Sequence, residues 1–288
     1  MAPRPWSARC SPGCSCAADG IVGAPVPTYL LTIAYDGSRF HGWQRQAGVR
    51  TVQEELERAC AAIDLPDTHV EGAGRTDTGV HAFGQCAHVR IPRTFPPGKL
   101  QLALNANLPE DVAVQRARVA PDDFHARFFA GGKRYLYRVV CSPVKPAVGR
   151  PYFHWSRRAV DLDAMRRAAR CLVGRHDFAS FATNPGYARS RGTVRTLHHV
   201  HLFRRRSGFD FAVQGSGFLY NMVRNLVGTL LEVGYGNRDP EWVGEVLRGR
   251  DRRLAGATAP ARGLYLLRVL YNADLTPAGE EPGRAGDQ

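Results

Sequence analysis

The sequence GAGRTDTGVHA (residues 72–82) places one carboxylate, Asp77, in a segment rich in glycine. The residues before it, HVEGAG (69–74), predict a short strand, and the residues after it, GQCAHVRI (84–91), predict a longer one. Glycines permit unusual backbone dihedrals and close approach of two backbones. The stretch is therefore predicted to be a strand–loop–strand element whose polar tip is exposed where two strands end.

Strands and helices alternate irregularly along the rest of the chain, without βαβ periodicity and without a phosphate-binding GxGxxG motif. This favours an α+β fold with a mostly antiparallel sheet. The order through residue 121 (strand, helix, strand, strand, helix, strand) resembles the later order, which predicts two similar lobes. Helices are predicted at 51–63, 97–108, 161–174, 220–234 and 240–249, and further strands at 28–37, 111–119, 134–141, 193–203, 208–218 and 262–271.

Two of these helices carry capping signals. Thr51 and Glu54 have the spacing of a capping box. Asp161 is expected to cap the helix at 161–174, and Gly174 to stop it. The strand RYLYRVVC alternates so that Tyr135 and Tyr137 share one face.

The composition divides the chain into four parts. Residues 1–28 are rich in Pro, Gly, Ala and Ser and are expected to be a disordered N-terminal extension. Residues 29–121 are expected to form an N-terminal lobe that carries the loop, and residues 122–274 a C-terminal lobe. Residues 275–288 are expected to be a flexible tail.

The formal net charge is +13, and nearly all of the basic residues are arginines. A surplus of this size favours a polyanionic partner, because guanidinium groups suit phosphate; a solvated basic surface is the alternative. No apolar run approaches the roughly 20 residues that span a bilayer, and the N-terminus lacks the apolar core of a secretory signal. Of seven cysteines, none in a CxxC pair, the four outside the N-terminal tail fit a reducing compartment, so a cytoplasmic location is expected. The three in the tail could bind a metal but lack a fourth nearby ligand.

The loop residues themselves suggest chemistry. A solvated aspartate has a pKa of about 3.9 and is a poor nucleophile, and burial alone would neutralise it. Arg75 is two residues away, on the same side of an extended segment, and could keep Asp77 ionised while water is excluded. That arrangement suits a carboxylate nucleophile or a general base. The alternative is a surface Arg–Asp pair in a tight turn, contributing at most about 1 kcal/mol.

GRTDTGVHA resembles the motif G-R-T-D-x-G-V-H of the tRNA pseudouridine synthase A family. YDGSRFHGWQRQ, TVQEELERA, NANLPEDVAV, PDDFHARFFA, KRYLYRV and NMVRNLVGTLLEVG resemble further blocks of that family, in the same order. The resemblance covers roughly residues 29–272. It implies the pseudouridine synthase fold, with helices on one face of the sheet and an active-site cleft between the two lobes.

The resemblance also implies an activity. Such a chain would isomerise uridine to pseudouridine at positions 38, 39 and 40 of the tRNA anticodon stem-loop, with Asp77 as the nucleophile and without a metal or organic cofactor. Attack on ribose C1′ and attack on uracil C6 both remain open. A homodimer whose subunits both contact the tRNA anticodon arm is expected, with no membrane association. The alternative is a catalytically silent RNA-binding protein on the same fold.

Three further site residues follow from the resemblance. Arg75 would join Asp77 in catalysis, holding it ionised and filling the space that the flipped base vacates. Tyr135 would stack on that base; without the resemblance, a core residue of the alternating strand is the favoured interpretation. Arg224 lies in an apolar helix and could pair with Asp77, or could face solvent at the helix end.

The remaining assignments concern RNA contacts and histidines. His81 is expected to fix the loop rather than act as a base. His198, His199 and His201 alternate on a strand, where surface histidines are favoured over a metal site. The residues expected to contact RNA are Phe124, His125, Ala126, Arg127 and Phe128 in one segment, and Arg189 and Arg191 in a basic loop.

Overall fold

The computed structural model describes residues 26–184 and 192–271. They form a mixed α+β structure around one 10-stranded sheet, in which eight strands follow the order β4-β1-β3-β10-β5-β9-β8-β7. Neighbouring strands are antiparallel except for the pairs β10–β3 and β5–β6. The strands are β1 (Thr28–Tyr35), β2 (Glu71–Gly72), β3 (His81–Arg90), β4 (Val112–Ala120), β5 (Gly132–Cys141), β6 (His154–Ser156), β7 (Gly174–Asp177), β8 (Val194–Arg205), β9 (Gly208–Gly215) and β10 (Leu264–Leu270).

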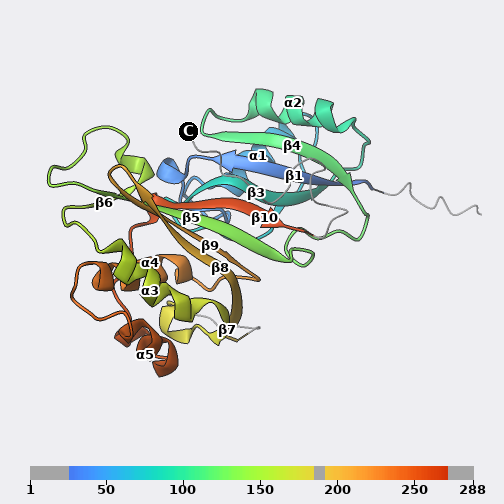
Figure 1. Ribbon diagram of the computed structural model, residues 1–288. Helices are drawn as coiled ribbons and strands as arrows, with labels where there is room; N and C mark the ends of the chain where they lie inside the picture. Colours follow the sequence, from blue (N-terminus) through green and yellow to red (C-terminus); the bar gives the residue numbers. More distant parts are fainter. Residues whose placement is uncertain (1–25, 185–191, 272–288) are drawn as a thin grey trace, which may run out of the picture.

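The helices divide between the two ends of the sheet, as Figure 1 shows. One group accompanies β4, because α1 and α2 contact each other and α2 contacts this edge strand. The other group accompanies β5, β7 and β8. The helices are α1 (Val52–Ala61), α2 (Pro97–Asn107), α3 (Leu162–Ala169), α4 (Met222–Gly234) and α5 (Trp242–Gly249).

Every predicted helix and strand is present, with ends shifted by a few residues. The strand that leaves the loop begins earlier than predicted, at His81, so the end of the motif already belongs to β3. The predicted α+β class with a mostly antiparallel sheet is confirmed. The sequence patterns did not reveal the short strands β6 and β7.

The helix caps follow the predictions only in part. Asp161 caps α3 as predicted, because its side chain accepts from the backbone N–H groups of Asp163 and Ala164. The capping box at α1 is wrong: Thr51 is the N-cap residue, but its hydroxyl makes no capping bond, and its buried Oγ1 has no hydrogen-bond partner. Glu54 pairs instead with Arg58, one turn along the helix.

The last strand in the sequence lies in the middle of the sheet. β10 pairs with β5 on one side and, in parallel, with the start of β3 on the other. Tyr265 and Leu266 are opposite His81 and Ala82, the residues that end the loop motif. The C-terminal strand therefore joins the two halves of the sheet directly beside the loop.

Two further features of the chain are its helix hydropathy and its cysteines. In the part of the chain that the structure describes, no helix has the length and hydropathy needed to cross a membrane. Cys60 and Cys86 are buried free thiols, and Cys141 and Cys171 are half-buried free thiols. The three N-terminal cysteines lie outside the described residues.

Candidate active site

The motif loop connects β2 to β3 and rests on the segment that follows β1. Trp43 N–H donates to the carbonyl of Thr76 at 3.1 Å, and Gly79 N–H donates to the carbonyl of Phe40 at 3.3 Å. Gly42 has φ +87°, and a Cβ there would lie 2.5 Å from the Thr76 oxygen. Only glycine fits this combination of positive φ and close approach. Gly42 thus allows the segment after β1 to pack closely against the motif loop.

His81 anchors the other end of the loop. Its ring is buried and stacks on Tyr265, with ring centroids 4.8 Å apart. The N–H of Gly37 donates to Nδ1 at 3.1 Å, and the Nε2 atom is 2.9 Å from the carbonyl oxygen of Pro151. The Nδ1 atom also lies 3.1 Å from Oδ1 of Asp36. Both ring nitrogens are engaged, which confirms the prediction that His81 fixes the loop.

Asp77 and Arg224 form an ion pair that joins the two halves of the molecule. Asp77 comes from the loop before β3 and Arg224 from the first turn of α4. The Nη1 atom of Arg224 is 3.1 Å from Oδ2 of Asp77. The Asp77 side chain is only 23% exposed and the Arg224 side chain 17%, so water screens the pair weakly. The pairing predicted for Arg224 is confirmed.

Arg224 is itself held in place by two acceptors besides the carboxylate. Its Nε donates to the carbonyl of Ala259 at 2.7 Å, and its Nη1 to Oδ1 of Asn221 at 2.7 Å. Asn221, the N-cap residue of α4, has φ +58°, a conformation that asparagine tolerates better than most residues. The guanidinium is thereby oriented toward Asp77.

The surroundings of Asp77 act on its pKa in opposite directions. Burial raises the pKa of the carboxyl, and Arg224 lowers it through both charge and hydrogen bonding; burial prevails. A carboxylate that has lost water but keeps one cation nearby is less solvated, and therefore more reactive, than a surface aspartate.

The predicted ion pair between Arg75 and Asp77 is wrong. Within the described residues, no carboxylate lies within ion-pair distance of the Arg75 guanidinium, and the side chain is exposed. The prediction assumed that two residues so near in the loop would pair, whereas the Asp77 carboxylate meets the guanidinium of Arg224 on α4 instead. Asp77 therefore faces α4, while Arg75 faces solvent beside it.

Tyr135, on β5, lies near the Asp77 carboxylate. Its ring is 8% exposed and meets Phe218 edge-on, with centroids 5.0 Å apart. Burial raises the pKa of its phenol, and the charge of Asp77 contributes in the same direction. Tyr137, on the same face, is fully buried and donates its hydroxyl to Pro260 O at 2.7 Å. Both tyrosines are buried, but they differ: the Tyr137 hydroxyl bonds to a backbone carbonyl, whereas the Tyr135 phenol is near enough to Asp77 for the charge of that carboxylate to act on it.

A tyrosine that the sequence analysis did not single out supports the loop from β1. The hydroxyl of Tyr35 is 2.7 Å from Oγ1 of Thr76, the residue before Asp77. Burial raises the pKa of the Tyr35 phenol, and Asp77 adds to the effect. Its position as the last residue of β1, directly before the Asp36-Gly37 turn, was the available signal.

The segment FHARF presents only part of itself to solvent. Phe124 and Ala126 are fully buried, so the RNA contact expected of these two side chains is wrong in this structure. Phe124 packs against Phe129 and Tyr271. Its companions are accessible: Arg127 is exposed, Phe128 is 62% exposed, and His125 is half-buried with its ring centroid 4.2 Å from that of Phe128.

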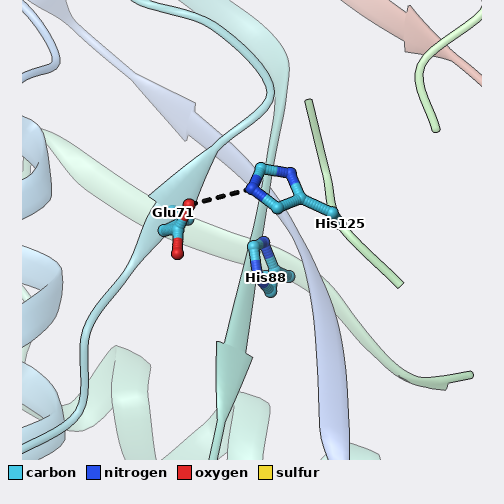
Figure 2. Close-up of side chains that lie close together, drawn as sticks. All are labelled: Glu71, His88 and His125. Atoms are coloured by element: carbon cyan, nitrogen blue, oxygen red, sulfur yellow. Dashed lines mark ion pairs between the residues drawn. The ribbon is translucent and has the colours of Figure 1, made fainter. Parts of the chain in front are cut away.

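Figure 2 shows Glu71, His88 and His125, whose side chains converge from β2, β3 and the FHARF segment. Their ligand-type atoms lie within 4.8 Å of one another, close enough to consider a metal ion. Hydrogen bonds oppose that use. The N–H groups of Ala126 and Arg127 donate to Nδ1 of His88 and of His125, at 3.3 and 3.2 Å.

With both Nδ1 atoms accepting, the proton of each neutral ring is on Nε2, where a metal would need a lone pair. In His125, Nε2 is 3.0 Å from the Glu71 carboxylate. Burial lowers the pKa of His88, which favours its neutral form. The geometry is that of a hydrogen-bonded clasp that fixes the FHARF backbone to the strands on either side of the loop.

The other predicted basic and histidine residues lie elsewhere. Arg189 and Arg191 are outside the described residues. His198, His199 and His201 are exposed on β8, and the rings of the last two are stacked 6.0 Å apart. Within residues 26–184 and 192–271, they belong to no group of ligands close enough to hold a metal.

Comparisons with known proteins agree with this geometry. A family model described as tRNA pseudouridine synthase matches residues 31–128 and 168–272. A curated protein named tRNA pseudouridine synthase A from Pseudomonas aeruginosa is 45% identical over 249 residues, 86% of this chain and 87% of that protein. One of the same name from Salmonella paratyphi B is 42% identical over 252 residues, 88% and 93% of the two chains.

One solved structure is a distant match. It is titled "Structure of H/ACA RNP bound to a substrate RNA containing 2'-deoxyuridine". The match has a TM-score of 0.30 and 10% identity, covering 71% of this chain and 53% of that one. A likeness this weak carries no argument about function.

Proposed function

The chain belongs to the tRNA pseudouridine synthase family, and from this premise we propose that it isomerises uridine to pseudouridine at positions 38, 39 and 40 of the tRNA anticodon stem-loop. We propose Asp77 as the nucleophile. The observation that carries the proposal is the Asp77–Arg224 ion pair at 3.1 Å, two-thirds or more withdrawn from solvent, beside the Tyr135 ring. A carboxylate in this setting is kept near a cation while a nucleoside approaches.

The reaction requires the target nucleotide to leave the helix stack, which costs a few kcal/mol. Stacking on an aromatic ring returns about 1–3 kcal/mol, and Tyr135 offers that ring. Arg75 is exposed close to Asp77 in the sequence. A side chain that enters the space left by the flipped base has to be accessible in this way.

The bonds can then be followed one by one. Asp77 attacks the nucleoside, at ribose C1′ or uracil C6, and the bond between N1 and C1′ breaks. The uracil turns, C5 bonds to C1′, and the C5 proton is lost while N1 takes up a proton. The carboxylate is released unchanged. Arg224, fixed by Asn221 and the Ala259 carbonyl, stays beside it throughout.

RNA binding is proposed to extend from this site across His125, Arg127 and Phe128, with Arg189 and Arg191 as further contacts. An accessible aromatic next to an exposed arginine suits an unpaired base and its phosphate. We further propose a cytoplasmic homodimer that binds the tRNA anticodon arm. Light scattering of the purified protein at micromolar concentration would measure the dimer.

The test of the nucleophile is Asp77→Asn. With tRNA tritiated at C5 of uridine, the wild-type chain should release tritium and the variant should not, while tRNA affinity persists. Asp67→Asn is the matched control, because Asp67 is exposed and its substitution removes the same charge. Mass spectrometry of the variant checks that the asparagine has not deamidated.

The outcomes separate the candidate functions. Release by an intact Asp77→Asn protein would exclude Asp77 as nucleophile. Binding without release, by the wild-type chain on several tRNAs, would favour a silent RNA-binding protein instead. Substituting cytidine for uridine at positions 38, 39 and 40 one at a time should abolish the product at that position alone.

A further inference from the structure

Lys133 brings an amine to the back of the motif loop. It lies on β5 two residues before Tyr135, so the two side chains leave the same face of the strand. A Cβ on Gly74 would collide with its Nζ atom, which therefore lies directly against this glycine. Gly74 is the residue before Arg75, so Lys133 approaches the loop at the base of its polar tip.

This amine lacks a neutralising partner. Among the residues that the structure describes, no carboxylate comes within ion-pair distance of Lys133 or of Arg127. Burial lowers the pKa of Lys133 to about 8, and the positive charge of Arg127 contributes in the same direction. A half-buried cation without a counter-ion is costly to the fold, so a purely structural lysine would be expected to have one.

Two further arginines contribute positive charge to this side of the loop. Arg127 is exposed on the FHARF segment, and Arg75 is exposed on the loop. The clasp of Glu71, His88 and His125 fixes the backbone that carries Arg127 (Figure 2). Lys133 is fixed by its strand and by Gly74, and Arg127 is near enough for its charge to act on the ammonium, so two positive charges face the same region from two fixed segments.

We propose that Lys133, together with Arg127, binds a backbone phosphate of the tRNA next to the nucleotide that stacks on Tyr135. The inference rests on the proposed function for the identity of the ligand. Residues two apart on a strand are separated by roughly 7 Å, so a nucleotide on Tyr135 has its phosphate within reach of Lys133. An ammonium contacts phosphate as a compact charge with three donors.

The first experiment compares Lys133→Met with Lys99→Met, an identical change at an exposed lysine near the start of α2. We expect Lys133→Met to weaken binding of unmodified tRNA by about tenfold or more, and to reduce the slope of log affinity against log salt by roughly 1. Lys99→Met should leave both unchanged. An unaltered slope for Lys133→Met, whether affinity falls or not, would overturn the assignment.

The second experiment labels the amines directly, which avoids any loss of folding in a variant. The chain has three lysines, Lys99, Lys133 and Lys145, so each can be followed by mass spectrometry after brief acylation with acetic anhydride. Saturating tRNA should protect Lys133 several-fold and leave Lys99 unprotected. Equal labelling of Lys133 with and without tRNA would contradict phosphate binding at this amine.

Neither readout requires catalysis, so this inference can fail separately from the proposed function. A chain that protects Lys133 but releases no tritium from C5 of uridine would refute the isomerase activity and leave the phosphate site standing. A chain that releases tritium without protecting Lys133 would refute only the phosphate site.

Discussion

At the scale of single residues, the site depends on which cation accompanies Asp77. Arg75 is nearer in sequence, but Arg224, 147 residues away, makes the ion pair. Proximity in a loop does not ensure contact, because the packing of α4 against the loop brings a different guanidinium to the carboxylate. Arg75 is left exposed, and the charge beside the carboxylate comes from a helix.

A pH dependence follows from this pairing. Burial raises the pKa of Asp77, and the nucleophile must be deprotonated, so kcat/KM should rise with pH as the carboxyl loses its proton. Arg224 holds that pKa down. We expect Arg224→Gln to move the acidic limb of the pH–rate profile to higher pH, in addition to lowering the rate.

Arg75→Gln is the comparison, since it removes the same charge from a residue that makes no ion pair with Asp77. It should lower kcat/KM without moving the acidic limb. Tritium release measured between pH 5 and pH 9 distinguishes the two variants. A limb that shifts equally in both would show that Arg224 has no special effect on the carboxyl.

At the scale of elements, α1 and α3 begin with residues of the same capping class but differ in what those residues do. The Asp161 carboxylate accepts two backbone N–H groups, whereas the Thr51 hydroxyl is buried without a partner. Burying a hydroxyl without a hydrogen bond costs free energy, while a satisfied cap stabilises its helix. The two helices should therefore respond oppositely to loss of the polar group.

We expect Thr51→Val to increase the free energy of unfolding by about 1 kcal/mol, because the isosteric side chain removes the unpaired hydroxyl. Asp161→Ala should lower the midpoint temperature instead. Urea and thermal unfolding followed by circular dichroism measure both. A destabilised Thr51→Val protein would mean that the hydroxyl has a partner after all.

The Asp161 effect should also depend on pH. Hydrogen bonding from Ala164 N–H holds the pKa of Asp161 below its usual value. A group whose pKa is lower in the folded state stabilises the fold above its unfolded pKa, about 3.9, and loses that contribution as the pH falls through the folded value. The difference between wild type and Asp161→Ala should therefore be full at pH 7 and disappear in strong acid.

At the scale of the whole molecule, the net charge of +13 predicts the salt dependence of RNA binding. Contacts to phosphate release counterions, so affinity falls with salt in proportion to the number of contacts. Between about 50 and 200 mM salt, affinity for unmodified tRNA should fall by more than roughly tenfold. Fluorescence anisotropy with a labelled tRNA measures this, and a flat response would show that the arginines do not bind phosphate.

The sheet topology is also a property of the whole molecule. β10 is the last strand in the sequence, yet it lies between β3 and β5 and pairs with the residues that end the motif loop. The C-terminal half also supplies Arg224. The loop in the N-terminal half can therefore reach its final geometry only after the end of the chain has joined the sheet.

The sequence alone determined the helices, the strands other than β6 and β7, the α+β class, the Asp161 cap and the family, because these follow from local periodicity, turn chemistry and motif spacing. It also indicated that Arg224 could pair with Asp77, since a charge in an apolar helix needs a partner. The tertiary structure decided the rest. The position of α4 gave Asp77 the guanidinium of Arg224 as its partner. Packing buried Phe124 and left the Thr51 hydroxyl unpaired, and the register of β5 placed Lys133 against Gly74. Each of these contacts depends on how distant elements meet in three dimensions, which no local pattern in the chain encodes.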